Sequence, residues 1–149
     1  MSLSNKLAQE MKTAIKARNK TRLRGLRAIK SAVLLAKTDG SGKELDEARE
    51  IKILQKLIKQ RQDSLTIFEQ QNREDLAVIE REEIEVIQEF LPEQMDTAEL
   101  EQILSGIIAQ VGAVSMRDMG KVMGKAAGQL KGKADNKTIS TIIKRLLSK

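Results

Sequence analysis

The sequence predicts an all-α protein: a bundle of about four helices at the amino-terminal end, including long amphipathic ones, followed by a small three-helix unit. Apolar residues recur at spacings of three and four along most of the 149 residues, which is the pattern of helices with one buried face. Residues that typically start or end helices separate these apolar stretches. The single proline, Pro92, falls where the charge of the chain also changes, so we place a domain boundary beside it.

Four helices are expected before Pro92. Two short ones meet at residues 17–19, and a turn cluster at residues 38–42 separates them from a long amphipathic helix, whose apolar stripe is interrupted at Arg61. A fourth helix begins near residue 72 and stops before Pro92, because the residue that precedes a proline avoids helical backbone angles. The apolar residues that mark the four helices are Leu3, Leu7, Met11, Ala14; Leu23, Leu26, Ile29, Val33, Leu34; Leu45, Ala48, Ile51, Leu54, Leu57, Ile58, Leu65, Phe68; and Leu76, Ile79, Val86, Ile87, Phe90.

We expect residues 1–93 to form the amino-terminal domain and residues 94–149 the three-helix domain. Ser115 with Asp118, and Asp135 further on, each stand just before an apolar helical pattern. Their side chains are of the kind that accepts hydrogen bonds from the first backbone N–H groups of a helix. We therefore assign Asp118 and Asp135 to helix caps rather than to acid catalysis.

A helical pattern with three regularly spaced glycines lies between residues 118 and 135. Gly120, Gly124 and Gly128 are four residues apart, which places them on one side of a helix. A glycine in a helix interior costs roughly 1 kcal/mol relative to alanine, so three of them on one stripe imply a compensating reason. Two reasons remain open: tight packing against another helix, and close approach of a ligand such as a phosphate.

Four segments together resemble the YqeY-like family over essentially the whole chain. They are RLRGLRAIKSAV at residues 22–33, REDLA at 73–77, FLPEQM at 90–95 and DMGKVMGKAAGQLKGKAD at 118–135. The carboxy-terminal part of that family is similar to the tail domain of the B subunit of the glutamine-dependent tRNA amidotransferase. The resemblance implies contact with tRNA within an amidotransferase assembly, and it carries a family label of glutamine-dependent carbon–nitrogen ligase activity.

Composition excludes several reaction classes. The chain has no histidine, cysteine, tryptophan or tyrosine, so it contains neither a Ser-His-Asp triad, nor a Cys-His pair, nor a histidine or cysteine zinc site. No nucleophile has a recognisable base, and we expect no cofactor and no metal. The glutamates of the fourth helix are expected to form a solvated face; they are Glu80, Glu82, Glu83, Glu85 and Glu89. No apolar run approaches the length of a membrane span, so the prediction is a cytoplasmic protein without membrane contact.

Charge is distributed unevenly along the chain. Residues 1–37 carry ten basic residues and one acidic one, a net charge of +9, whereas residues 38–95 carry −7 and residues 96–149 carry +4. Such asymmetry indicates either a polyanionic partner or the folding of one segment against another. For the first 37 residues both interpretations remain open.

The basic tail is the predicted functional surface. Helical spacing puts Lys121 and Lys125 on one side of a helix, while other lysines gather around the turn into the last helix or lie along it. The candidate RNA-binding residues are Lys121, Lys125, Lys131, Lys133, Lys137 and Lys144, with Arg145 and Lys149 extending the charge. The two phenylalanines, Phe68 and Phe90, both precede the tail, so recognition of bases by stacking is not expected.

These features predict a non-catalytic, tRNA-associated helical module that reads RNA shape and phosphates. Its partner would be tRNA or another structured RNA, and its affinity would fall steeply with salt. An alternative is a protein-interaction adaptor that docks an amidotransferase or another translation component, and an apolar stripe left exposed on residues 46–90 would favour it. A third reading is glutamine-dependent ligase activity of the chain itself, which the available residues do not support. The oligomeric state is left open.

Overall fold

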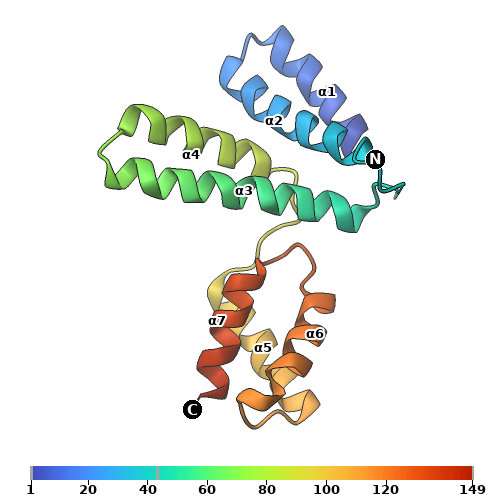
Figure 1. Cartoon of the computed structure of the whole chain (residues 1–149), viewed down its shortest axis with the longest axis vertical. Coiled ribbons are helices and arrows are strands. Elements are labelled where there is room, and N and C mark those ends of the chain that lie inside the picture. Colours follow the sequence, from blue (N-terminus) through green and yellow to red (C-terminus); the bar gives the residue numbers. More distant parts are fainter. Residues whose placement is uncertain (1, 43, 149) are drawn as a thin grey trace. The chain divides into compact units, whose positions relative to one another are not determined.

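The computed structural model describes residues 2–42 and 44–148, and every regular element in them is helical (Figure 1). The all-α prediction is confirmed for these residues. Their elements are α1 Leu3–Lys16, α2 Lys20–Lys37, α3 Glu47–Gln70, α4 Glu74–Gln88, α5 Thr97–Val111, the 3₁₀ helix η1 Met116–Asp118, α6 Met119–Gln129 and α7 Asn136–Leu147.

The chain divides into two compact units. The amino-terminal unit comprises residues 1–91 and contains α1 to α4, and the tail unit comprises residues 92–149 and contains α5 to α7. The division falls directly before Pro92, two residues ahead of the boundary placed from the sequence.

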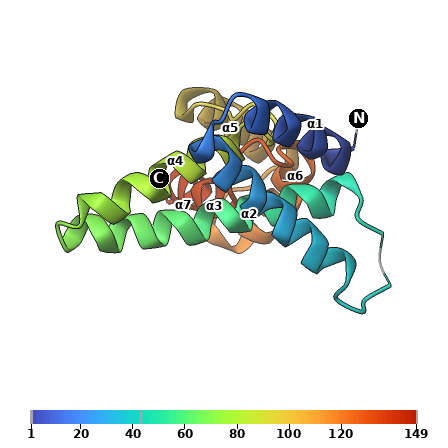
Figure 2. The same cartoon turned by 90° about the horizontal axis from the view of Figure 1, so that it is seen from above.

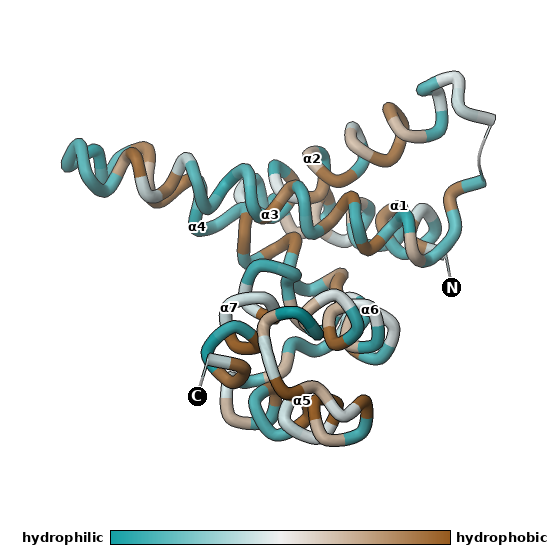
Figure 3. Tube along the Cα trace, turned by 60° about the horizontal axis from the view of Figure 1, so that its bottom comes forward, coloured by the Kyte–Doolittle hydropathy of each residue, from teal (hydrophilic) through white to brown (hydrophobic). Residues whose placement is uncertain are grey.

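Two antiparallel helix pairs form the amino-terminal unit (Figure 2). α1 pairs with α2 and α3 pairs with α4, while α2 contacts both helices of the second pair. The buried residues between them are aliphatic: Leu3, Leu7, Ala14, Leu26, Ile29, Val33, Leu54, Ile58, Ile84, Val86 and Ile87. Figure 3 shows how hydrophobic and hydrophilic residues recur along each helix, which is what lets one face of each helix enter this core.

Helices α2 and α4 approach each other closely at a glycine of α2. A Cβ atom built on Gly25 would lie 2.7 Å from the Cβ of Val86 in α4 and 2.9 Å from its Cγ1. Real Cβ atoms are not found so close to another carbon, so only glycine lets α2 and α4 meet at this distance. Close helix packing, one of the two explanations considered for the tail glycines, occurs here at Gly25.

Ion pairs partly settle the question about the basic first 37 residues. Arg22 pairs with Glu10 and Glu89, at 2.8 and 2.7 Å, and Arg24 pairs with Glu82 and Glu83 of α4, at 2.9 and 3.2 Å. Two of the ten basic residues therefore neutralise acids within the unit. Among the described residues, no carboxylate lies within 4.0 Å of the other eight.

The glutamates of α4 are less uniformly solvated than expected. The side chain of Glu83 is only 13% exposed and bridges Arg24 and Arg61, the latter at 2.8 Å. Arg61, which interrupts the apolar stripe of α3, therefore faces a carboxylate on the neighbouring helix. Burial raises the pKa of the adjacent Glu80 carboxyl, and the nearby Glu83 adds to that rise. The prediction of a wholly solvated face is wrong at Glu83, because α2 and α3 both bring an arginine to it.

The tail unit is a three-helix bundle around its own core. Its buried residues are Leu100, Leu104, Ile107, Val122, Ala126, Leu130, Ala134, Ile139, Ile142, Ile143 and Leu147. Gly112, at φ +69°, ends α5 in the left-handed conformation that glycine adopts without strain. Met119 and Met123 pack against this core, as expected for gap-filling side chains.

The predicted caps of the tail unit are confirmed. Asp135 accepts a hydrogen bond from the backbone N–H of Thr138 at 2.6 Å, at the start of α7. Ser115 and Asp118 form a reciprocal capping box, in which Asp118 Oδ2 accepts from Ser115 N at 3.3 Å. The same oxygen also accepts from Val114 N at 2.9 Å. The helix expected from Ser115 onward begins as the 3₁₀ turn η1 and becomes α-helical only at Met119.

Candidate nucleic-acid interface

The glycines of α6 face open space. A Cβ atom built on Gly120, Gly124 or Gly128 would meet no heavy atom within 4 Å, apart from the backbone of its own helix and the two chain neighbours. The buried residues Val122 and Ala126 turn the opposite side of α6 toward the core. The interpretation that these glycines serve tight helix packing is therefore wrong within the tail unit. Close approach of a ligand remains a prediction.

Two lysines border this glycine face, which we define as Gly120, Gly124 and Gly128. Lys121 lies three residues before Gly124, and Lys125 lies three residues before Gly128, so each lysine stands next to a glycine on the helix surface. Lys121 is exposed and Lys125 is half-buried. Both lysines therefore flank a strip of α6 where a built Cβ atom would meet no neighbouring atom within 4 Å.

The turn between α6 and α7 presents Lys131 and Lys133, which are both exposed. Gly132 between them is buried and has φ +76°, a conformation that favours glycine. Its carbonyl accepts a hydrogen bond from Gln94 Nε2 at 2.6 Å, and the carbonyl of Lys133 accepts one from the backbone N–H of Met95 at 3.0 Å. The segment that follows Pro92 thus fixes the backbone of the lysine turn.

The last helix adds two more lysines. Lys137 lies in the first turn of α7, next to the Asp135 cap, and Lys144 lies seven residues later on the same side of the helix. Both are exposed, because the four isoleucines and leucines of α7 that are buried occupy the other side. Arg145 is engaged by Glu101 of α5, at 2.9 Å, and Lys149 lies outside the described residues.

All six candidate lysines thus belong to the tail unit, two on α6, two in the turn and two on α7. No carboxylate of the described residues lies within 4.0 Å of any of them. Asp118 is the acid nearest in sequence to Lys121. The pKa of Asp118 is lowered by the hydrogen bonds that its carboxylate accepts from two backbone N–H groups, and the charge of Lys121 adds slightly to that shift. The charges of these six lysines are therefore available to an anion from outside the chain.

The described residues contain no group of three or more histidine, cysteine, aspartate or glutamate side chains that could hold a metal ion. No helix among them is both long and apolar enough to cross a membrane. What the tail unit offers is ammonium groups and an accessible helix backbone, and both suit phosphate oxygens.

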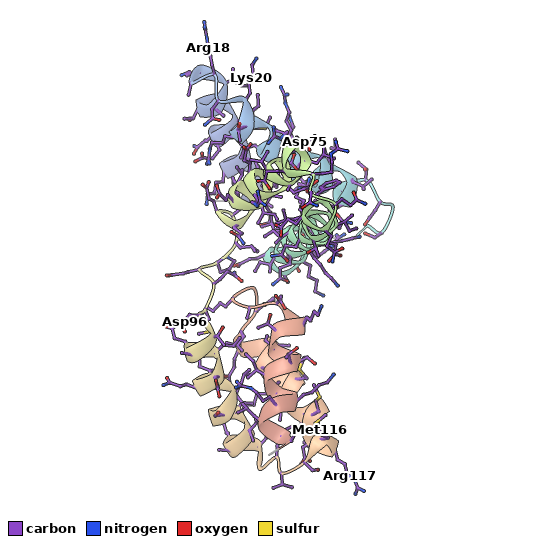
Figure 4. The ribbon with its side chains drawn as sticks, turned by 90° about the vertical axis from the view of Figure 1, so that its left-hand side faces the viewer. Arg18, Lys20, Asp75, Asp96, Met116 and Arg117 are labelled. Atoms are coloured by element: carbon purple, nitrogen blue, oxygen red, sulfur yellow. The ribbon has the colours of Figure 1, made fainter. Side chains whose placement is uncertain are left out.

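Two structural roles escaped the sequence reasoning. Gln94 holds the lysine turn through Gly132, a contact between residues 38 positions apart that no local pattern indicates. Gly25 is a single glycine inside the apolar pattern of α2, and its contact with Val86 joins residues far apart in the sequence. At the far end of α5, Met116 and Arg117 project from the η1 turn (Figure 4). Met116 is 45% exposed.

The fold and this surface define a class: an all-helical protein of two units, whose tail unit carries an exposed basic surface with an open glycine face. The chain belongs to the YqeY-like family, whose model, described as Yqey-like protein, matches residues 4–147.

Three fungal relatives share the printed name "Altered inheritance of mitochondria protein 41, mitochondrial". The protein of Vanderwaltozyma polyspora is 31% identical over 144 residues, which cover 92% of this chain and 77% of the relative. That of Lachancea thermotolerans is 32% identical, covering 70% of this chain and 57% of the relative, and that of Clavispora lusitaniae is 35% identical, covering 68% and 58%. The names place these relatives in mitochondria, so a cytoplasmic location of this chain stays a prediction.

Proposed function

We propose that this protein is a non-catalytic, tRNA-associated module whose tail unit binds the phosphates of a folded RNA. One observation carries the proposal: the glycine face of α6 is open and is bordered by lysines that have no carboxylate within 4.0 Å in the described part of the chain. A sugar–phosphate strand can approach a helix backbone that has no side chains more closely than any other part of the helix surface.

The energetic cost of the glycine face supports the proposal. Each helical glycine costs roughly 1 kcal/mol relative to alanine, and Gly124 lies in the middle of α6. Within the tail unit no neighbouring atom fills the space that a Cβ would take, so packing does not offset this cost. An external partner that needs close contact with the helix would give the glycines a function.

The mode of binding follows from the residues present. Lysine ammonium groups bind phosphates as point charges and read no base sequence, and both phenylalanines lie outside the tail unit. Recognition would therefore depend on the spacing of phosphates in a folded RNA, with little sequence preference. The resemblance of the tail to the B subunit of the tRNA amidotransferase identifies tRNA as the RNA to test first.

The test is a salt titration of the full chain with total tRNA, measured by fluorescence anisotropy, with duplex DNA of equal length as competitor. We expect binding that weakens steeply with salt and that prefers tRNA over DNA. For each phosphate neutralised, the binding constant should fall by about 0.9 logarithmic units per tenfold rise in salt concentration. Equal affinity for the two nucleic acids would leave only non-specific charge attraction. Absence of binding at low salt would refute the proposal.

A protein-interaction adaptor is the second candidate, and one observation favours it. Ile67 of α3 and Val78 and Ile79 of α4, near the turn that joins these helices, are 50%, 39% and 36% exposed. Exposed aliphatic side chains mark a protein contact when they form one patch. An amidotransferase would be the partner to test, by sedimentation of the two proteins together. If the protein is an adaptor, the two proteins should sediment together without tRNA, and Ile79→Glu should weaken this association.

A further inference from the structure

A groove runs between α1 and α2 on the amino-terminal unit. Its volume is about 230 Å³, and eight residues line it: Ser4, Leu7, Ala8 and Met11 of α1, and Lys30, Val33, Leu34 and Lys37 of α2. Five of them are apolar. Leu7 and Val33 are buried, at 3% and 4% exposure, whereas Leu34 is 59% exposed. The groove thus has an apolar floor, and its edge includes a leucine with most of its surface in water.

The dimensions of this groove suit side chains rather than a free metabolite. Pockets that enclose small-molecule ligands usually measure about 300–1,000 Å³, and this one is smaller. Its lining repeats over two helical turns, from Ser4 to Met11 on one side and from Lys30 to Lys37 on the other. Two neighbouring helices with an apolar furrow between them are the surface on which a third helix packs, with its own side chains inserted between theirs.

Charge determines which helix would fit. The lining contains two lysines and no acidic residue. Lys37 Nζ donates a hydrogen bond to Ser4 Oγ at 3.0 Å. The charge of Lys37 affects the pKa of the Glu50 carboxyl, but the two groups do not lie within 4.0 Å of each other. No carboxylate of the described residues pairs with Lys30. An acidic partner would therefore find two available ammonium groups, separated by seven residues or about 10 Å along α2.

We propose that the α1–α2 groove binds an amphipathic helix with acidic flanks, contributed by a partner protein. Aliphatic residues of that helix, spaced three or four apart, would insert over Leu7 and Val33 and cover Leu34. Carboxylates about two turns apart would pair with Lys30 and Lys37. The site lies on the amino-terminal unit and needs none of the tail lysines, so it neither depends on RNA binding nor explains it.

The experiment uses the full chain and two labelled helical peptides of about 18 residues, since isolated helices need roughly this length. Both carry leucines at positions i, i+3, i+4 and i+7; one has glutamates on its flanks and the other has lysines. We expect the glutamate peptide to bind at least tenfold more tightly than the lysine peptide, by fluorescence anisotropy at physiological salt.

Two matched comparisons locate the binding. Leu34→Gln should weaken binding of the glutamate peptide about tenfold, whereas Leu35→Gln, at a neighbouring leucine that is 71% exposed but does not line the groove, should leave it unchanged. Lys30→Glu with Lys37→Glu should reverse the preference in favour of the lysine peptide. Circular dichroism of each variant checks that the helices are intact.

Three results would overturn the proposal. The glutamate peptide binds wild type and Leu34→Gln equally; the charge reversal leaves the preference unchanged; or neither peptide binds. A fourth measurement addresses another occupant: if sedimentation shows that the chain alone self-associates and that Leu34→Gln makes it monomeric, a second copy fills the groove and the proposed partner is wrong. A salt titration of the same variants with tRNA tests the RNA proposal independently, because it measures RNA binding and not occupation of the groove.

Discussion

Gly25 of α2 lies so close to Val86 of α4 that a Cβ atom at Gly25 would stand 2.7 Å from the Cβ of Val86. The crossing of these helices holds the two helix pairs of the amino-terminal unit together, because α2 is the helix that contacts both α3 and α4. Leu26 and Ile29, which follow Gly25 on α2, are fully buried in the same core.

Gly25→Ala should destabilise the amino-terminal unit by about 1–2 kcal/mol, because the strain of forcing the helices apart exceeds the gain in helix propensity. Hydrogen exchange of core amides in α2 and α4 measures the effect for this unit alone. Gly106→Ala is the control: Gly106 lies within α5, where a Cβ meets no atom within 4 Å, so this variant should be slightly more stable. Unchanged exchange in Gly25→Ala would contradict the close crossing.

Gly124→Ala should have opposite effects on stability and on RNA binding. It should stabilise α6 by about 0.5–1 kcal/mol, since the added methyl group meets open space and alanine is the better helix former. It should also weaken tRNA binding if a phosphate strand contacts the helix backbone. Gly106→Ala is again the control, and it should stabilise without any effect on binding. An equal tRNA affinity in both variants would remove the glycine face from the binding surface.

Lys121→Glu with Lys125→Glu should weaken tRNA binding without unfolding the tail unit. The slope of log affinity against log salt should decrease by the contribution of about two phosphate contacts. Neither lysine is among the buried residues of α6, which are Val122 and Ala126, although Lys125 is half-buried. The matched control is Lys52→Glu with Lys56→Glu, an exposed pair with the same spacing on α3. If the two double variants lose affinity equally, overall charge rather than this face is responsible.

Glu83→Gln should destabilise the amino-terminal unit by about 1–3 kcal/mol, because it leaves Arg24 and Arg61 without their shared carboxylate at a site that is only 13% exposed. Glu82→Gln removes a carboxylate that is 36% exposed and pairs with Arg24, and it should cost less than about 1 kcal/mol. Hydrogen exchange of the core amides of α3 and α4 compares the two. Equal losses of stability in the two variants would show that the burial of Glu83 does not increase the contribution of its ion pairs.

The capping box of η1 predicts a dependence on acid. Asp118 has a lowered pKa because its carboxylate accepts the backbone N–H groups of Val114 and Ser115. A depressed pKa in the folded state means that the stabilisation is complete above the ordinary aspartate pKa, near 4, and is lost as the pH falls through the lower folded value. Once exchange rates are divided by the intrinsic rate at each pH, the protection of α6 amides should therefore fall below about pH 4, and Asp118→Asn should reduce that change. A pH profile identical to wild type would argue against the cap.

Sequence patterns located the helices because helix formation depends on nearby residues. Asp135 and Ser115 were assigned as caps from their positions alone, and their hydrogen bonds confirm it, since a cap joins residues two to four apart. Start sites were less certain: the helix expected from Ser115 opens as a 3₁₀ turn, a choice between two hydrogen-bond patterns that the sequence does not distinguish.

The glycines show where local reasoning fails. Their spacing in α6 was correctly read as one side of a helix, but spacing does not tell whether another helix covers that side, and none in the tail unit does. Gly25 has no such repeat, yet α2 packs against Val86 of α4 there without room for a Cβ atom. A packing partner is contributed by a residue far away in the chain, here Val86, 61 positions later.

By itself, the sequence determined that this chain is helical, that it lacks the residues of common catalytic and metal sites, and that its tail is basic. Periodicity and capping depend on residues that are neighbours in the sequence, and composition is a sum over all residues, so all three can be read directly from the sequence. Tertiary structure decided which charges are neutralised and which stay available: Arg22 and Arg24 meet glutamates of α4 and its end, whereas the tail lysines meet none among the described residues. It also opened the groove between α1 and α2. Pairing and exposure depend on which distant segments pack together, and that arrangement follows from the cores of the two units.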